Sequence, residues 1–297
     1  MRDGLVVVDK PGGCTSHDVV ARLRHVYRQR RVGHAGTLDP DATGVLLVGL
    51  GRVTRLLRFL AETGKTYRGD VVLGVATSTL DAAGSVLDRK PMSVTRAQLD
   101  EVARRFVGDL QQVPPMVSAL KVGGRRLHDL ARHGEEVERP PRPVRIDRLD
   151  IEHFEPGPYP VATILVECST GTYVRSLAAD LGAALGGCAH LGALRRLRVG
   201  SFDVSEAHTL DTIAAAPDDV LLTPAIAMRD LERLDVDDEQ ARAVRHGMTF
   251  PCSTLPAPLG TGPFAVADER GDLLAVYERR HAGIKPAVVV AAGPDGT

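Results

Sequence analysis

Two ionisable residues, His34 and Asp39, lie in a glycine-rich stretch, residues 32–47, which reads VGHAGTLDPDATGVLL. Glycine permits backbone angles that other residues avoid, and Pro40 biases Asp39 away from the helical region. We therefore expect a stiff loop that presents one imidazole and one carboxylate. Asp-Pro pairs also start ordinary turns, so the stretch alone does not establish a site. Flanking basic residues and plausible partners later in the chain favour a catalytic interpretation.

Two later residues have the chemistry to act with Asp39. Tyr67 lies in a predicted strand, where it packs at the strand end or, alternatively, stacks on a ligand or handles a proton. Arg175 lies in the first turn of a predicted helix, where the helix dipole disfavours a cation, so an anion is needed nearby and Asp39 is the candidate. A carboxylate paired with arginine stays ionised at neutral pH, ready to attack or to stabilise positive charge at a sugar carbon.

Several other chemistries do not fit the sequence. It contains no Walker loop, Rossmann glycine pattern, His-Glu-x-x-His motif or clustered cysteine and histidine ligands, so we expect no nucleotide cofactor and no metal. A single candidate carboxylate argues against an ordinary glycosidase, which needs two. A nucleobase within folded RNA is reached only by flipping it out, and an aromatic side chain then holds it.

Length and composition indicate a globular protein with more than one domain. The chain has 297 residues, of which 43% are hydrophobic and 25% are charged. It has no apolar run long enough to span a membrane and no signal peptide pattern. Its four cysteines are scattered, as reduced cytosolic thiols are. We therefore expect a cytoplasmic protein without a membrane span.

The net charge of −1 hides a strong asymmetry along the chain. Residues 1–60 hold ten lysines and arginines against five acids, whereas residues 201–240 hold eleven acids against two arginines. Basic segments opposed by an acidic one predict a one-sided surface for a polyanion. Each basic run by itself is explained as simply by a solvated helix face, and only the combination with the loop favours RNA.

The hydrophobic pattern predicts an α+β protein. Helices are expected over residues 16–27, 53–60, 96–106, 173–185 and 238–246, with caps from Thr15 or Ser16 and from a Thr95–Gln98 capping box. Strands are expected over residues 5–8, 45–50, 66–73, 145–154, 161–168, 191–199 and, after residue 228, in several short segments. Residues 75–84 and 256–263 read as loops, and residues 111–143 as a long basic excursion containing a short helix that ends at Gly134.

Six blocks of the sequence, in order, resemble the TruB-type tRNA pseudouridine synthases. They are KPGGCTSHDVV, GHAGTLDPDATGVL, KTYRGDVVLG, PPMVSALK, CSTGTYVRSLAADLG and AHLGALRRLRVGSF, and they cover most of residues 5–202. In the fourth block Val117 stands where an aromatic residue is frequent in the family. The segment after Leu231 resembles the family only weakly.

The resemblance implies the fold, the partner and the domain division. It implies a pseudouridine synthase fold in residues 1–228, with a long mixed, mainly antiparallel sheet flanked by helices. A small, mostly β, PUA-like RNA-binding domain would follow in residues 229–297. Residues 121–143 would form a thumb-like RNA-binding excursion. The implied partner is the T stem-loop of tRNA, bound by a monomer with no obligatory protein partner and no cofactor.

The resemblance also implies a role for each candidate residue. Asp39 would attack a flipped-out uridine 55, and whether it attacks the base or the sugar, or acts through a glycal, stays open. Tyr67 would stack on the base and take part in proton removal at C5, and Arg175 would pair with Asp39. His34 would help to hold the T loop open. Further contacts to the nucleotide and the RNA would come from Lys10, Pro11, Tyr173, Leu194, Lys121, Arg125 and Arg126. From the sequence alone, Lys10 is either a phosphate contact or a solvated turn residue.

Two other functions remain to be distinguished from this one. The first is a non-catalytic tRNA-binding or RNA-folding protein on the same scaffold, and the set Asp39, Tyr67 and Arg175 argues against it because a pure binder needs no such carboxylate. The second is an RNA-guided relative that works within a protein complex. The sequence has no long lysine-rich tail, which favours the stand-alone bacterial type.

Overall fold

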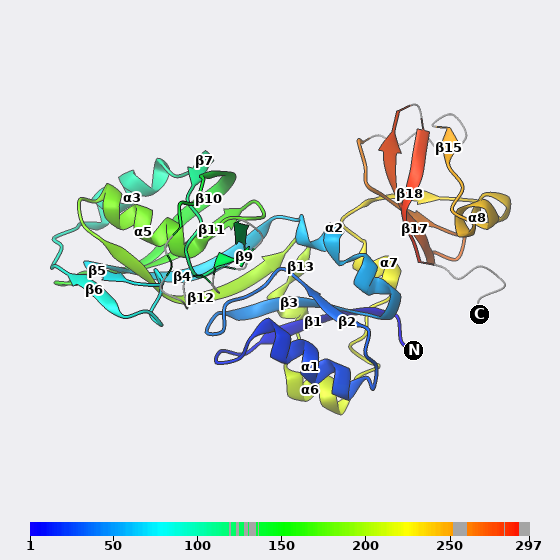
Figure 1. Cartoon of the computed structure of the whole chain (residues 1–297), viewed down its shortest axis with the longest axis horizontal. Coiled ribbons are helices and arrows are strands. Elements are labelled where there is room, and N and C mark those ends of the chain that lie inside the picture. The colour runs from blue at the N-terminus through cyan, green and yellow to red at the C-terminus, as the bar shows by residue number, and fades with distance from the viewer. Residues whose placement is uncertain are drawn as a thin grey trace. The chain divides into compact units, whose positions relative to one another are not determined.

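The computed structural model describes residues 1–118, 120–122, 125–127, 130, 135, 137–251, 260–281 and 283–290, and it divides into two compact units (Figure 1). The first unit comprises Met1–Pro40, Gly44–Glu62 and Val199–Thr297. The second comprises Asp41–Thr43 and Thr63–Arg198. Both segments of the second unit are therefore flanked in sequence by segments of the first unit.

The first unit is built on three antiparallel strands, β1 (Gly4–Lys10), β2 (Val32–Ala35) and β3 (Thr43–Leu50), with β1 and β2 both paired to β3. Helix α1 (Ser16–Val26) packs against β2 and buries Val19, Val20 and Leu23 along one face. The side chains of Thr15 and Asp18 form a reciprocal capping box at the start of this helix. The predicted N-terminal strand and helix are thus confirmed.

The acidic segment, residues 201–240, follows the second unit in sequence and is hydrogen-bonded to β1. It contains β13 (Phe202–Asp203), the 3₁₀ helix η2 (Val204–Glu206), α6 (Leu210–Ala215) and α7 (Pro224–Ala227). Backbone hydrogen bonds join Leu5 with Leu222 in both directions, and the amide of Asp9 donates to the carbonyl of His208. Residues 208 and 222 therefore extend the hydrogen bonding of β1.

The C-terminal part of the first unit is a small five-stranded sheet in the order β14-β16-β17-β18-β15. Its elements are β14 (Glu232–Asp235), α8 (Asp238–Arg245), β15 (Phe250–Pro251), β16 (Phe264–Ala267), β17 (Leu273–Arg280) and β18 (Gly283–Val289). Phe264, Val266 and Tyr277 are fully buried in its core. This confirms a small, mostly β C-terminal domain around one helix. The strand β15 was missed because it has only two residues, and residues 252–259 of the expected loop lie outside the described part.

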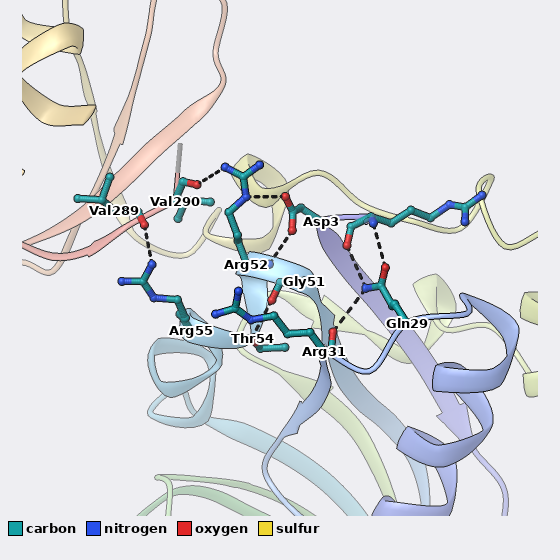
Figure 2. Close-up of polar contacts among 10 residues, drawn as sticks. Asp3, Gln29, Arg31, Gly51, Arg52, Thr54, Arg55, Val289 and Val290 are labelled. Carbon is teal, nitrogen blue, oxygen red and sulfur yellow. Dashed lines mark hydrogen bonds and ion pairs between the residues drawn. The ribbon is translucent and has the colours of Figure 1, made fainter. Parts of the chain in front are cut away.

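The 3₁₀ helix η1 (Gly51–Arg55) and helix α2 (Leu57–Ala61) follow β3, where one continuous helical stripe was expected. Arg52 links two distant segments from this position (Figure 2): its Nε donates to Asp3 Oδ2 at 2.8 Å and its Nη1 to the carbonyl of Val290 at 2.8 Å. Arg55 Nη1 donates to the carbonyl of Val289 at 3.0 Å. Gly51 has a φ of +59°, which permits this tight turn between β3 and η1.

The main strands of the second unit lie in the order β12-β4-β11-β10-β7, and the register shows antiparallel pairing from β4 through β7. The strands are β4 (Lys65–Leu73), β7 (Gly108–Gln112), β10 (Arg142–Glu155), β11 (Val161–Cys168) and β12 (Ala189–Val199). Helix α3 (Arg96–Arg104) packs on β10, α5 (Val174–Ala184) packs on β4, and the two helices contact each other. The predicted alternation in β4 is confirmed, since Tyr67, Gly69, Val71 and Leu73 are all buried.

Two loop predictions are wrong. Val32–Ala35 is a strand that pairs with β3, so His34 lies on a strand and the connecting loop is confined to residues 36–42. Residues 75–84 contain β5 (Val75–Thr77), which pairs with β6 (Val86–Arg89). Both errors have one cause: glycine and small polar residues suggest turns locally, whereas pairing with the next strand along the chain decides the conformation.

After residue 120 of the basic excursion, the structure describes a short ladder between β8 (Lys121–Val122) and β9 (Arg125–Arg126). The short helix expected up to Gly134 falls mainly on residues outside the described part.

The turn at Gly51 yields a stability prediction. A Cβ at this position would lie 2.0 Å from Oδ1 of Asp3 and 2.5 Å from the carbonyl oxygen of Arg2, at a φ that also strains an alanine. We expect Gly51→Ala to lower the free energy of unfolding by roughly 3 kcal/mol, because strain and the loss of the Asp3–Arg52 contact add. The measurement is urea unfolding followed by circular dichroism.

Gly186→Ala is the matched control for this variant. Gly186 has a φ of +81°, but a Cβ there would meet nothing within 4 Å. Backbone strain alone should cost about 1 kcal/mol. Equal losses in the two variants would contradict the role assigned to the Asp3 contact.

Candidate active site

The turn that carries Asp39 is held from one side by Ser16. The side chain of Leu38 is buried, and its backbone makes two hydrogen bonds with the Ser16 hydroxyl: Leu38 N donates to Oγ at 3.0 Å, and Oγ donates to the Leu38 carbonyl at 3.1 Å. Gly36 begins the turn with a φ of +75°. Asp39 itself is partly exposed. The backbone of Leu38 is therefore fixed directly before a partly exposed Asp39.

Lys10 holds the same turn from the other side. This last residue of β1 is completely buried, and its ammonium donates to the carbonyls of Pro11 and Pro40, each at 2.8 Å. Pro40 follows Asp39 directly, so a buried cation fixes the backbone after the carboxylate. The structure thus excludes the alternative that Lys10 is a solvated turn residue, and its predicted contact with RNA stays untested.

His34 and Pro11 accompany Asp39 in the first unit. His34 is partly exposed on β2, and its ring contacts that of His17 edge to face, with 5.6 Å between centroids. Pro11 is exposed in the turn after β1. Their predicted contacts with a nucleotide stay predictions.

Tyr67 and Leu194 lie in the second unit, on the neighbouring strands β4 and β12. Tyr67 is 7% exposed and Leu194 is partly exposed. A Cβ at Gly69 would approach the carbonyl of Ala193 and Cδ1 of Leu191 to 3.1 Å, and Cδ1 of Leu194 to 3.3 Å. The absence of a side chain at Gly69 therefore lets the chain around Leu194 lie close to β4, two residues from Tyr67.

Arg175 is buried in the first turn of α5, as predicted. Its guanidinium donates to the carbonyls of Thr79 (3.1 Å) and Val117 (2.8 Å), and its Nη1 lies 3.5 Å from Oδ2 of Asp81. These acceptors compensate a cation that the dipole of the helix opposes. The sequence reasoning missed Asp81 as a partner, since it placed this residue in a polar loop without a role.

Gln112 performs the capping that the sequence of α5 does not supply. Tyr173 is the N-cap residue of this helix, and its side chain makes no capping hydrogen bond. Gln112 Oε1 accepts from the amide of Tyr173 at 2.8 Å, and Nε2 donates to the Tyr173 carbonyl at 3.1 Å. Ser176 Oγ donates to the carbonyl of Val113 at 2.9 Å. The start of α5, with Tyr173 and Arg175, is thus bound to the first residues of the basic excursion.

Two further buried cations lie in the same unit. Lys65 and Arg196 are both buried, and Lys65 Nζ donates to the carbonyl of Thr63 at 2.7 Å. Burial, and secondarily the Arg196 guanidinium, lower the pKa of Lys65 to about 8. Cys168 stands opposite Lys65 in the ladder, and burial raises the pKa of its thiol to about 11.

The predicted RNA contacts of the excursion are described only in part. Arg125 is exposed and makes two hydrogen bonds to Glu135, at 3.0 and 2.9 Å. Lys121 and Arg126 are paired in the β8–β9 ladder. Their contacts with RNA remain predictions.

The predicted residues divide between the two units. Lys10, Pro11, His34 and Asp39 belong to the first, and Tyr67, Tyr173, Arg175 and Leu194 belong to the second. The structure brings Lys10 to the turn of Asp39 and joins Tyr173 and Arg175 at one helix start. The predicted pairing of Asp39 with Arg175 concerns residues of different units and stays a prediction.

Comparison with known proteins identifies the family to which this chain belongs. Residues 24–174 match the family model of the TruB family pseudouridylate synthases (N terminal domain), and residues 175–227 match that of the tRNA pseudouridylate synthase B C-terminal domain. The chain belongs to the TruB family. It is 45% identical to the tRNA pseudouridine synthase B of Thermobifida fusca (strain YX), over 98% of this chain and 99% of that protein. The protein of the same name from Symbiobacterium thermophilum is 49% identical over 83% and 82% of the two chains.

Solved structures agree on the fold of this TruB-family chain. A chain in the crystal structure of a Cbf5-Nop10-Gar1 complex superimposes with a TM-score of 0.78 at 24% identity, covering 97% of this chain and 85% of that one. A chain of an H/ACA RNP bound to a substrate RNA containing 2'-deoxyuridine gives a TM-score of 0.76 at 22% identity, covering 98% of this chain and 86% of that one. The predicted pseudouridine synthase fold is thereby confirmed. Among the described residues, no helix is long and apolar enough to cross a membrane.

The cap supplied by Gln112 yields a prediction on stability. We expect Gln112→Ala to lower the free energy of unfolding by about 1–3 kcal/mol, because the Tyr173 amide loses the acceptor oxygen of the buried Gln112 side chain and the Tyr173 carbonyl keeps only its bond from the Leu177 amide. Gln111→Ala is the matched control, since Gln111 is the exposed neighbour of the same type. Urea unfolding of both variants measures the difference. A Gln112→Ala variant as stable as Gln111→Ala would show that Gln112 does not support the start of α5.

The buried Lys65 yields a prediction on pH dependence. Its folded pKa of about 8 lies below its ordinary value of 10.5, so the unfolded chain binds more protons within this window and the Lys65 contribution to stability rises with pH. Lys65→Met removes this titration. We therefore expect the unfolding free energy of wild type, relative to Lys65→Met, to rise by up to about 3 kcal/mol between about pH 7 and pH 10.5.

Urea unfolding at several pH values tests this linkage. Lys90→Met, at an exposed lysine, controls for the loss of a surface charge at each pH. A difference between wild type and Lys65→Met that stays constant across the window would refute the lowered pKa.

Proposed function

We propose that this chain isomerises uridine to pseudouridine at position 55, in the T loop of tRNA. The observation that carries the proposal is the turn of Asp39: a partly exposed carboxylate on a backbone fixed by Ser16 and Lys10, in the block GTLDP of a TruB-family chain. The chain aligns over nearly its full length with a relative named tRNA pseudouridine synthase B, which supports tRNA as the substrate. Family membership and an intact candidate set argue against a non-catalytic binder.

The reaction rearranges bonds within one nucleotide. The C1′–N1 bond of the flipped uridine breaks, the base rotates, a C1′–C5 bond forms, and the C5 proton leaves while N1 gains a proton. Atoms and electrons balance without an external oxidant or reductant. Asp39 supplies the nucleophile, and attack on the base and attack on the sugar are both compatible with a partly exposed aspartate on a fixed backbone.

The other residues have supporting roles in this proposal. Tyr67 stacks on the flipped base and takes part in proton removal at C5, and Arg175 pairs with Asp39 to keep the carboxylate ionised. His34 holds the T loop open. The pocket is lined by Lys10, Pro11, Tyr173 and Leu194, and Lys121, Arg125 and Arg126 contact phosphates of the T stem-loop.

The wider organisation follows from the same proposal. Residues 1–228 form the catalytic domain, residues 121–143 act as a thumb on the RNA, and residues 229–297 form a PUA-like RNA-binding domain. The protein acts as a monomer in the cytoplasm without an obligatory protein partner. The small C-terminal sheet of five strands supports a binding module of this kind.

The decisive experiment measures tritium release from tRNA transcripts that carry C5-tritiated uridine. Isomerisation leaves the mass unchanged, but it detaches the C5 hydrogen. Wild type should release tritium, and replacing uridine 55 by cytidine should abolish the release. We expect Asp39→Asn to bind tRNA and to lower the rate by roughly 10³-fold or more, because the amide is not a nucleophile.

Asp41→Asn is the matched control, since Asp41 is an exposed aspartate two residues further along the same segment. It should release tritium at nearly the wild-type rate. Tight tRNA binding by wild type without any release would refute the isomerase and favour RNA remodelling. Release by Asp39→Asn at the rate of Asp41→Asn would remove Asp39 from the role of nucleophile.

A further inference from the structure

Ser16 is a buried hydroxyl that the reaction does not use. It is the first residue of α1 and is 1% exposed. Its hydroxyl exchanges two hydrogen bonds with the backbone of Leu38, 22 residues further along the chain. A hydroxyl can donate one hydrogen bond and accept others, so one side chain here satisfies both polar groups of a buried residue.

The two bonds fix the backbone that leads into Asp39. The Leu38 carbonyl belongs to the peptide plane that also contains the amide nitrogen of Asp39, so the bond from Ser16 Oγ restrains that plane directly. Lys10 restrains the peptide plane after Pro40 through its carbonyl. The α-carbon of Asp39 is therefore held between a hydroxyl on one side and an ammonium on the other.

We propose that Ser16 is a positioning residue for the Asp39 carboxylate, an inference that rests on the proposed function. Covalent attack requires reacting atoms at near-contact distance, and small misplacements of a nucleophile are costly. Ser16 acts through the backbone of Leu38 and not through contact with the RNA. Its loss should therefore slow the chemical step more than it weakens tRNA binding.

Helix capping does not account for Ser16. The cap of α1 is Thr15, whose hydroxyl accepts from the amide of Asp18 at 3.1 Å, while the Asp18 carboxylate accepts from the amide of Thr15 at 2.8 Å. The capping box is complete without Ser16. Two adjacent hydroxyls at one helix start thus have separate tasks, and each can be removed without the other.

The test compares Ser16→Ala with Thr15→Ala and Ser16→Thr in full-length protein. The readouts are the single-turnover rate of tritium release at saturating tRNA, the Kd for tRNA and the melting temperature. We expect Ser16→Ala to lower the rate by about 10- to 100-fold and to change the Kd by less than about twofold. Thr15→Ala should lower the melting temperature through loss of the cap and keep the rate within about twofold. Ser16→Thr retains the hydroxyl and should keep a rate near that of wild type, even where its extra methyl group lowers stability.

Hydrogen exchange at the Leu38 amide gives a readout that does not depend on activity. This amide should be protected in wild type and in Thr15→Ala, and should exchange faster in Ser16→Ala. A wild-type rate in Ser16→Ala, or an equal loss of rate in Thr15→Ala, would overturn the proposal. Should Ser16→Ala not fold, a folded Ser16→Thr variant with a rate reduced 10-fold or more would overturn it as well. Failure of the proposed function is seen separately, as an absence of release by wild type.

Discussion

The pairing of β1 with β3 is the constraint on which the candidate nucleophile depends. In this ladder Lys10 stands opposite Gly44, at the point where the chain leaves the turn of Asp39 and enters β3. Burying an ammonium is costly unless it is hydrogen-bonded, and the carbonyls of Pro11 and Pro40 offset that cost. A slip of one residue would direct Lys10 to the opposite face of the sheet and leave the turn unsupported. The strand register thus determines how the backbone on the far side of Asp39 is held.

In the second unit, too, a buried cation is hydrogen-bonded to backbone carbonyls, here at the start of a helix. Arg175 opposes the dipole of α5 and is compensated by two carbonyls and Asp81, which come from segments far apart in sequence. Gln112 then supplies the missing cap at Tyr173. Because Val113 and Val117 are also bound by α5, the base of the basic excursion and the helix that carries Arg175 form one hydrogen-bonded assembly. A displacement of that base would strain the contacts of Arg175 directly.

The sequence predicted those features that have local signatures. The Thr95–Gln98 capping box and the alternation of β4 follow from spacing alone, whereas for α1 the sequence left the cap open between Thr15 and Ser16 and the structure assigns it to Thr15. Strand β2 could not be predicted, because its VGHA sequence resembles a turn until its pairing with β3 is known. The contacts of Ser16 with Leu38 and of Gln112 with Tyr173 span 22 and 61 residues, and nothing at either end marks the partner. The residues themselves were recognisable through the family, whereas the side chains that support them required the fold.

The C-terminal sheet packs against the segment that follows β3. Val276, Val288 and Val290 share one apolar cluster with Val53 and Leu56 of the segment after β3. Arg52 and Arg55 donate to the consecutive carbonyls of Val290 and Val289 at the end of β18, and Arg52 is itself oriented by Asp3 (Figure 2). The exposed pair of Arg58 and Glu278 adds little, since solvent screens it. Removing β18 would therefore uncover apolar residues next to β3, the strand that the turn of Asp39 enters. The C-terminal sheet thus contributes to the stability of the unit that carries the candidate nucleophile, whatever it contributes to RNA binding.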